Sequence, residues 1–307
     1  MGKLRQTRVI SWLRLFTEKL KSKHQAKRIK KKEGMEINKI YNENCLETMA
    51  KMPDNFVDLV VTSPPYDNIR EYNGYTFEFE KIAGELYRII KDGGILVWVV
   101  ADSVKNGTES CTSFIQAIHF KNIVGFNLHD TMIYRKENYT PLTHKRYEQE
   151  FEYMFVFSKG KPKTFNPIFI DCIHAGKIIK RSRSTYETGL SKRQASDEQP
   201  KPTGDKKQKG NVWSYKVGGG KTVNHVAQFP LQLATDHIRS WSNEGDLVYD
   251  CFMGSGTTAI SAINNQRKFI GSEISEEYCK IIETRIKECG GFFFNSFETE
   301  LSNEAGT

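Results

Sequence analysis

The feature that most restricts the fold of this chain is a regular alternation of short apolar runs with amphipathic segments, starting near Ile37. Apolar runs typical of buried strands occupy residues 57–61, 95–100, 154–157, 247–249 and 269–270. Segments with helical spacing lie near 45–51, 77–90, 110–119, 230–242, 256–264 and 275–287. Strands that alternate with helices predict an α/β fold with a doubly wound, mostly parallel sheet. The strand-like segments 126–135 and 151–158 are expected to pair antiparallel at a sheet edge.

The sequence TSPPY (62–66) directly follows the first of these apolar runs. Because proline has no N–H to donate to a sheet, Pro64 and Pro65 end the strand, and each restricts the residue before it. Ser63 and Tyr66 are therefore carried on stiff backbone at the carboxyl end of a strand, where ligands bind in open α/β sheets. An ordinary loop with a proline stop is the alternative on these residues alone.

A second motif, DLVYDCFMGSGTT (246–258), combines an apolar strand, a Gly-x-Gly turn and the start of a helix. Gly254 and Gly256 let the backbone approach a ligand closely, and the helix start offers free N–H groups. About 20 residues further on, a second strand ends at Glu273, where a carboxylate can accept hydrogen bonds from two ribose hydroxyls. This spacing predicts a nucleoside-binding βαβ unit.

The charge at the end of the first strand indicates which nucleoside binds. The dinucleotide pattern GxGxxG is completed only in its Gly/Ala form, by Ala259. Asp250 lies at the tip of the strand, where a carboxylate would repel the pyrophosphate of NAD and attract an ammonium group. S-adenosylmethionine carries an α-ammonium, a sulfonium and a ribose, so the sequence favours that cofactor.

Composition excludes several classes of protein. In the 307 residues no apolar run reaches the roughly 18–20 residues that span a bilayer. The six cysteines are scattered, with no CxxC pair, which argues against a zinc site and a disulfide framework and suits a reducing cytoplasm. No metal is expected.

The net charge of +8 is concentrated in two segments. Residues 1–33 hold 12 Lys or Arg and 2 acidic residues, and residues 171–221 hold 12 and 5, so the remainder of the chain is net acidic. A mildly acidic body with two basic segments is typical of a protein that binds a polyanion. Solvated basic loops are the simpler alternative.

These patterns divide the chain into five parts. Residues 1–34 form a basic N-terminal extension and 35–159 the half that carries TSPPY. Residues 160–222 form a polar, basic insert in which no hydrophobic period is apparent, 223–290 carry the glycine turn, and 291–307 form a C-terminal tail.

Together the two motifs resemble the amino-methyltransferases of DNA, which methylate adenine N6 or cytosine N4. The resemblance covers roughly residues 36–287 without 160–222 and rests on TSPPY (62–66), GELYRIIKDGGILVWVVAD (84–102), FEYMFVFSKG (151–160), NHVAQFPLQLATDHI (224–238), DCFMGSGTT (250–258) and GSEISEEYCKIIETRI (271–286). TSPPY precedes the glycine turn, an order that resembles the circularly permuted β-class. The implied fold is the Rossmann-like, S-adenosylmethionine-dependent methyltransferase fold, with residues 160–222 as a target-recognition insert.

The resemblance also implies roles for individual residues. The Ser63 hydroxyl and the Pro64 carbonyl would accept hydrogen bonds from the target amino group, with Pro65 completing the motif and Tyr66 stacking on a base flipped out of the duplex. DNA contacts are expected from Arg181, Arg183, Lys192 and Arg193, with Gln194, His144, Lys145 and Arg146 as further candidates. The cofactor would contact Asn44, Cys45, Phe229, Pro230, Asp250, Phe252, Gly254, Gly256, Thr257 and Glu273. Asn44 departs from the usual Asp of the family, and Cys45 is equally consistent with a small buried helix residue.

Several alternatives stay open at this level. Ser-Pro-Pro-Tyr favours cytosine N4 over adenine N6 as the target, although a serine acceptor could serve either base. RNA or protein methylation and a non-catalytic DNA-binding relic are the competing functions. Expected partners are double-stranded DNA and, in a restriction–modification setting, a cognate endonuclease. The protein is expected in a bacterial or phage-infected cytoplasm, away from membranes, as a monomer or homodimer.

The basic segments lead to a prediction for DNA binding. Because each phosphate neutralised by Lys or Arg releases counterions, affinity for duplex DNA should fall steeply with salt. Titrations at roughly 50 and 200 mM salt would measure the slope on a log–log plot. A DNA affinity that does not change with salt would mean that the basic insert does not contact DNA.

Overall fold

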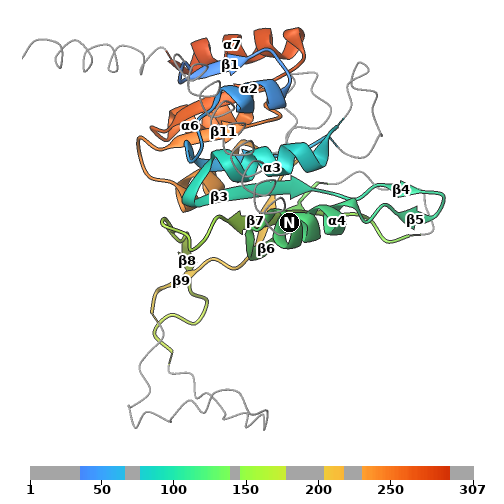
Figure 1. Cartoon of the computed structure of the whole chain (residues 1–307). Coiled ribbons are helices and arrows are strands. Elements are labelled where there is room, and N and C mark those ends of the chain that lie inside the picture. Colours follow the sequence, from blue (N-terminus) through green and yellow to red (C-terminus); the bar gives the residue numbers. More distant parts are fainter. Residues whose placement is uncertain (1–34, 66–76, 139–145, 178–203, 218–229, 291–307) are drawn as a thin grey trace, which may run out of the picture.

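A computed structural model describes residues 35–65, 77–138, 146–177, 204–217 and 230–290. At its centre is an eight-stranded sheet with the order β1-β12-β11-β2-β3-β7-β6-β10 (Figure 1). Its strands are β1 (Lys39–Tyr41), β2 (Val57–Thr62), β3 (Ile90–Val100), β6 (Asn127–Lys136), β7 (Phe151–Ser158), β10 (Val212–Tyr215), β11 (Leu247–Asp250) and β12 (Lys268–Ser272). Two small two-stranded sheets pair β4 (Val104–Lys105) with β5 (Thr108–Glu109), and β8 (Phe169–Asp171) with β9 (Lys206–Gln208).

The strand directions confirm the predicted mostly parallel, doubly wound sheet. β1, β12, β11, β2 and β3 run parallel to one another, β7 runs antiparallel between β3 and β6, and β10 is parallel to β6. The antiparallel pairing of the segments 126–135 and 151–158 is confirmed as β6 and β7. Their predicted position at the sheet edge is wrong, because β10 lies outside β6.

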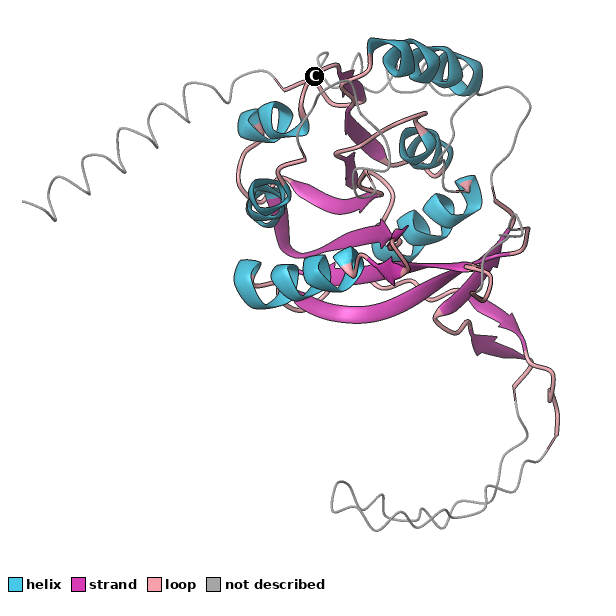
Figure 2. Ribbon diagram, turned by 90° about the vertical axis from the view of Figure 1, so that its right-hand side faces the viewer, coloured by secondary structure: helices cyan, strands magenta, loops and turns pink. Residues whose placement is uncertain are grey.

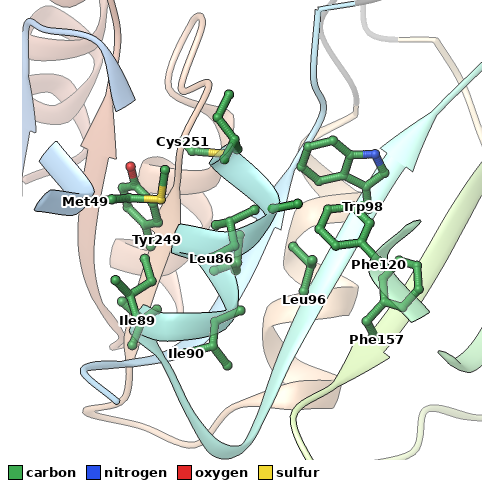
Figure 3. Close-up of a cluster of buried hydrophobic side chains, with 14 of the residues drawn as sticks. Met49, Leu86, Ile89, Ile90, Leu96, Trp98, Phe120, Phe157, Tyr249 and Cys251 are labelled. Atoms are coloured by element: carbon green, nitrogen blue, oxygen red, sulfur yellow. The ribbon is translucent and has the colours of Figure 1, made fainter. Parts of the chain in front are cut away.

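Helices cover both faces of the sheet (Figure 2). They are α2 (Cys45–Lys51), α3 (Phe79–Ile89), α4 (Thr112–His119), α5 (Leu231–Trp241), α6 (Thr257–Asn264) and α7 (Glu276–Gly290), with a π-helical turn η1 (Phe120–Val124) after α4. Strand alternation separates two cores. In β3, Leu96 and Trp98 face α2, α3 and η1 (Figure 3), whereas Val97 and Val99 face α5, α6 and α7.

The interpretation of residues 160–222 as lacking a hydrophobic period is wrong for residues 212–215. This segment alternates exposed and buried residues as β10, and Trp213 and Tyr215 point into the core. The Tyr215 hydroxyl donates to Asp236 Oδ2 on α5 at 2.6 Å, so the described end of the insert is fixed to the body. Four residues of alternation are too few to detect within a polar segment.

The predicted DNA contacts Arg181, Arg183, Lys192 and Arg193, together with Gln194, His144 and Lys145, lie outside the described residues, as does the N-terminal extension. Arg146 is described, and its guanidinium pairs with Glu109 at 3.3 Å. The five-part division of the chain stays a prediction.

Among the described residues, no helix is long and apolar enough to cross a membrane.

His237 on α5 is a fully buried titratable group in the second core. Its ring lies 4.7 Å from that of Trp213, and Nε2 lies 3.2 Å from Met154 Sδ, while Nδ1 has no hydrogen-bond partner in the part of the chain that the structure describes. Burial lowers the pKa of His237 to about 3. The imidazole is therefore neutral in the folded protein at any pH near neutrality.

This burial predicts acid sensitivity. The pKa of His237 is lower in the folded than in the unfolded state, so its contribution to stability is complete above the unfolded value of 6.5 and is lost as pH falls towards about 3. Between pH 7 and 5 that linkage amounts to about 2 kcal/mol. Urea denaturation at both pH values should show this loss, reduced in His237→Gln and retained when the exposed His174 is changed to Gln. An unchanged pH dependence in His237→Gln would contradict it.

Candidate active site at the carboxyl edge of the sheet

The predicted motifs meet at one edge of the sheet. β1, β12, β11 and β2 are parallel neighbours, so the segments that follow them all emerge at their carboxyl ends. From β11 the chain passes through α6 to β12 on one side, whereas from β2 it passes through α3 to β3 on the other. The order of strands therefore reverses between β11 and β2, and ligands of open α/β sheets bind at such a switch point.

Asp250 lies at this switch point, with only 1% of its surface exposed. Its carboxylate accepts hydrogen bonds from Thr62 Oγ1 at 2.6 Å, Thr258 Oγ1 at 2.6 Å and the backbone N–H of Phe252 at 3.0 Å. Burial raises the pKa of Asp250, and these three hydrogen bonds oppose that shift. The carboxylate that was predicted to attract the cofactor is thus already held by the protein on both oxygens.

The glycine turn adopts the left-handed backbone conformation that glycine readily takes. Gly254 and Gly256 have φ of +54° and +87°, and Gly256 is the N-cap of α6, whose first residue is the buried Thr257. A Cβ on Gly256 would lie 2.8 Å from Cγ2 of the buried Ile282. The Phe252 ring packs edge-on against those of Phe77 and Trp98, with centroids 5.8 and 6.3 Å apart.

Glu273 follows β12 and joins the turn to the start of α7. Its Oε2 accepts from Gly254 N at 2.8 Å and its Oε1 from Ser275 N at 2.9 Å. Burial raises its pKa. Since an ionised carboxylate has about four acceptor positions, each oxygen retains capacity for a ligand hydroxyl. Asn42 supports this position by donating its side-chain N–H to the Glu273 carbonyl at 2.9 Å.

The residues of TSPPY that the structure describes leave β2 beside this turn. Ser63 and Pro65 are half-buried and Pro64 is buried, while Tyr66 lies outside the described residues. Pro230, also buried, is the N-cap of α5, whereas Phe229 is not described.

Asn44 and Cys45 have clear local roles. Asn44 is the N-cap of α2, and its Oδ1 accepts the backbone N–H of Leu46 at 2.9 Å. Cys45 packs in the first core, and burial raises the pKa of its thiol to about 12. The thiol is therefore protonated at neutral pH.

Three residues of this edge were not singled out from the sequence, namely Asn42, Thr62 and Thr258. Thr62 and Thr258 lie inside the two motifs, TSPPY and DLVYDCFMGSGTT, so the sequence already marked the segments that carry them. Only the strand order, however, shows that both hydroxyls meet the same carboxylate.

Among the described residues, no group of three His, Cys, Asp or Glu side chains is arranged to hold a metal ion.

Comparison with known proteins identifies the family of the chain. Residues 57–284 match the N6_N4_Mtase family, described as DNA methylase, and the chain belongs to that family. It is therefore a DNA methyltransferase, and the predicted cofactor, S-adenosylmethionine, is confirmed as that of the family. The resemblance to DNA amino-methyltransferases is confirmed as well.

The chain is 47% identical over 252 residues to the orphan methyltransferase M.BamHII of Bacillus amyloliquefaciens, with 76% of this chain and 90% of that one aligned. It is 30% identical over 261 residues to the type II methyltransferase M1.MboII of Moraxella bovis, with 80% and 94% aligned. Among solved structures, the fold matches the cytosine-N4-specific PvuII DNA methyltransferase with a TM-score of 0.59 and 21% identity, covering 80% of this chain and 85% of that one.

The turn geometry predicts the effect of Gly256→Ala. The positive φ should cost about 1–2 kcal/mol, and the contact with Ile282 about 1–3 kcal/mol more. Calorimetric titration should show weaker binding of S-adenosylmethionine, and urea denaturation should show lower stability.

Gly107→Ala is the matched control, because Gly107 has φ of +79° but a Cβ added there would meet no atom of the described residues within 4 Å. It should show the backbone cost alone and bind the cofactor normally. Equal losses in the two variants would mean that Ile282 imposes no packing constraint on the turn.

Proposed function

We propose that this chain transfers the methyl group of S-adenosylmethionine to the exocyclic amino group of a base flipped out of double-stranded DNA, at a specific sequence, with cytosine N4 as the target. The observation that carries this proposal is the hydrogen bond between Thr62 and Asp250. It places the strand end that leads into Ser63 and Pro64 against the strand end that leads into the glycine turn.

The cofactor would lie along the carboxyl ends of β1, β12 and β11. Glu273 would accept the ribose hydroxyls with its remaining lone pairs, while Gly254 and Gly256 allow close approach of the backbone. Asp250 adds negative potential near the ammonium and sulfonium groups. Asn44, Cys45, Phe229, Pro230, Phe252 and Thr257 complete the proposed cofactor site.

The chemistry follows from the low nucleophilicity of an amino group conjugated to a base. Its lone pair becomes available when the nitrogen shifts towards sp³ geometry, which acceptors aimed at its hydrogens promote. The Ser63 hydroxyl and the Pro64 carbonyl would provide those acceptors, with Tyr66 against the face of the base. Methyl transfer is then a direct in-line displacement, to which the protein contributes mainly positioning, and no covalent enzyme intermediate is needed.

The choice of cytosine rests on Ser63, since Ser-Pro-Pro-Tyr is more typical of N4 than of N6 enzymes in this family. Sequence specificity would come from the insert 160–222 through Arg181, Arg183, Lys192 and Arg193. A relative named DNA adenine methyltransferase, YhdJ of Escherichia coli, is 28% identical over 262 residues, which makes adenine N6 the second target to test.

A product assay tests the proposal. Purified protein is incubated with S-adenosylmethionine and mixed-sequence duplex DNA, and the nucleosides from a digest are identified by mass spectrometry. N4-methylcytosine is the expected product. N6-methyladenine would keep the mechanism and overturn the choice of base, and an absence of methylated nucleosides with cofactor bound would contradict DNA methylation.

Substitution of Tyr66 separates stacking from cofactor binding. Tyr66→Ala should leave the affinity for S-adenosylmethionine unchanged and reduce methyl transfer roughly 10- to 100-fold, because stacking of a base on an aromatic ring contributes about 1–3 kcal/mol. Tyr66→Phe keeps the ring and should retain most of the activity. Wild-type turnover in Tyr66→Ala would exclude the stacking role.

A further inference from the structure

The two threonines that bond Asp250 come from opposite halves of the site. Thr62 is the last residue of β2, and Thr258 is the second residue of α6. Both are buried, and each donates to a different oxygen of the carboxylate at 2.6 Å. One carboxylate therefore joins the strand that carries the amino-group acceptors to the helix that follows the glycine turn.

The hydrogen bond from Thr62 to Asp250 lies beyond the last backbone pair of β11 and β2. The pairing of β11 with β2 extends only to Tyr249 opposite Val60. Beyond that point Thr62 stays paired with Trp98 of β3 and Asp250 with Gly271 of β12, on opposite sides of the switch point. The side-chain hydrogen bond from Thr62 to Asp250 is thus a link between the strand ends past the last paired residues, directly before Ser63 in the chain.

The hydroxyl of Thr62 is also an acceptor. The Cys251 thiol donates to Thr62 Oγ1 at 3.5 Å, and burial holds the pKa of that thiol well above its usual range, so the proton is retained. The hydroxyl proton of Thr62 is therefore directed to Asp250. Hydrogen bonds arranged in series in a buried environment strengthen one another and fix the rotamers involved.

We propose that Thr62, Asp250 and Thr258 form a positioning clamp that sets the distance between the amino group held at Ser63–Pro64 and the methyl group held at the glycine turn. This inference rests on the proposed methyl transfer and adds positioning residues to it. In-line transfer requires the reacting atoms about 3–3.5 Å apart, and a misplacement of about 1 Å can cost 10²-fold in rate. A rigid contact between the two binding segments meets that requirement.

The test compares Thr62→Val with Thr62→Ser. Valine keeps the shape and removes the hydroxyl, whereas serine keeps the hydroxyl. The single-turnover rate of methyl transfer at saturating DNA and S-adenosylmethionine should fall roughly 10- to 100-fold in Thr62→Val, with the Kd for the cofactor within about threefold of wild type, and Thr62→Ser should recover most of the rate. Thr258→Val should reproduce the loss from the other side of the clamp.

Thr48→Val is the matched control for a purely structural effect. Thr48 is also buried and donates to a carboxylate, Glu43 Oε1, at 2.8 Å, but on α2. It should lose stability without losing single-turnover rate when assayed well below its Tm. A wild-type rate in Thr62→Val, or equal rates in Thr62→Val and Thr62→Ser, would overturn the clamp while leaving the proposed function intact. An inactive wild-type protein would instead contradict the proposed function and leave the clamp no reaction to serve.

Discussion

The carboxyl group of Asp250, enclosed at the switch point of the sheet, constrains three segments of this structure at once. Removing a carboxylate from water costs several kcal/mol, and Asp250 is almost completely enclosed. The cost is offset only if β2, the glycine turn and α6 all present donors at once, through Thr62, the Phe252 N–H and Thr258. A displacement of any of the three leaves a buried charge with too few partners, so the geometry of the site and the stability of the central strands are coupled.

The same arrangement explains how one site is built from distant parts of the chain. Thr62 and Asp250 are 188 residues apart, yet β2 and β11 are neighbours because the parallel sheet places its strands independently of chain order. The intervening residues pass through β3, β6 and β7 and then form β10 at the outer edge of the sheet. The buried Asp236 accepts from Tyr215 and Gln232 on its two oxygens, so α5 fixes the returning strand close to the core.

Local sequence predicted most of the elements, and the failures have physical causes. Strands such as β2 and β3 are buried on both faces and read as continuous apolar runs. β10 is four residues long, with two buried aromatic side chains, and its pattern is lost among lysines and glycines. Placing β6 and β7 at the edge followed from missing β10. The side chain of Asn44 caps α2, a role that Asn favours at this position, and its predicted contact with the cofactor stays a prediction.

The sequence by itself determined the motifs from which the chemistry of this protein is predicted. The proline-bounded serine, the glycine turn and the acid after the next strand are all readable because each depends on backbone restrictions within a few residues. Only the tertiary structure decided which groups meet across the switch point. That Asp250 is held by two threonine hydroxyls, and that Glu273 bonds the glycine turn, depends on strand order and sheet geometry. Hydrogen bonds between residues far apart in the chain leave no local pattern, since their distances are set by the packing of the whole sheet between its two layers of helices.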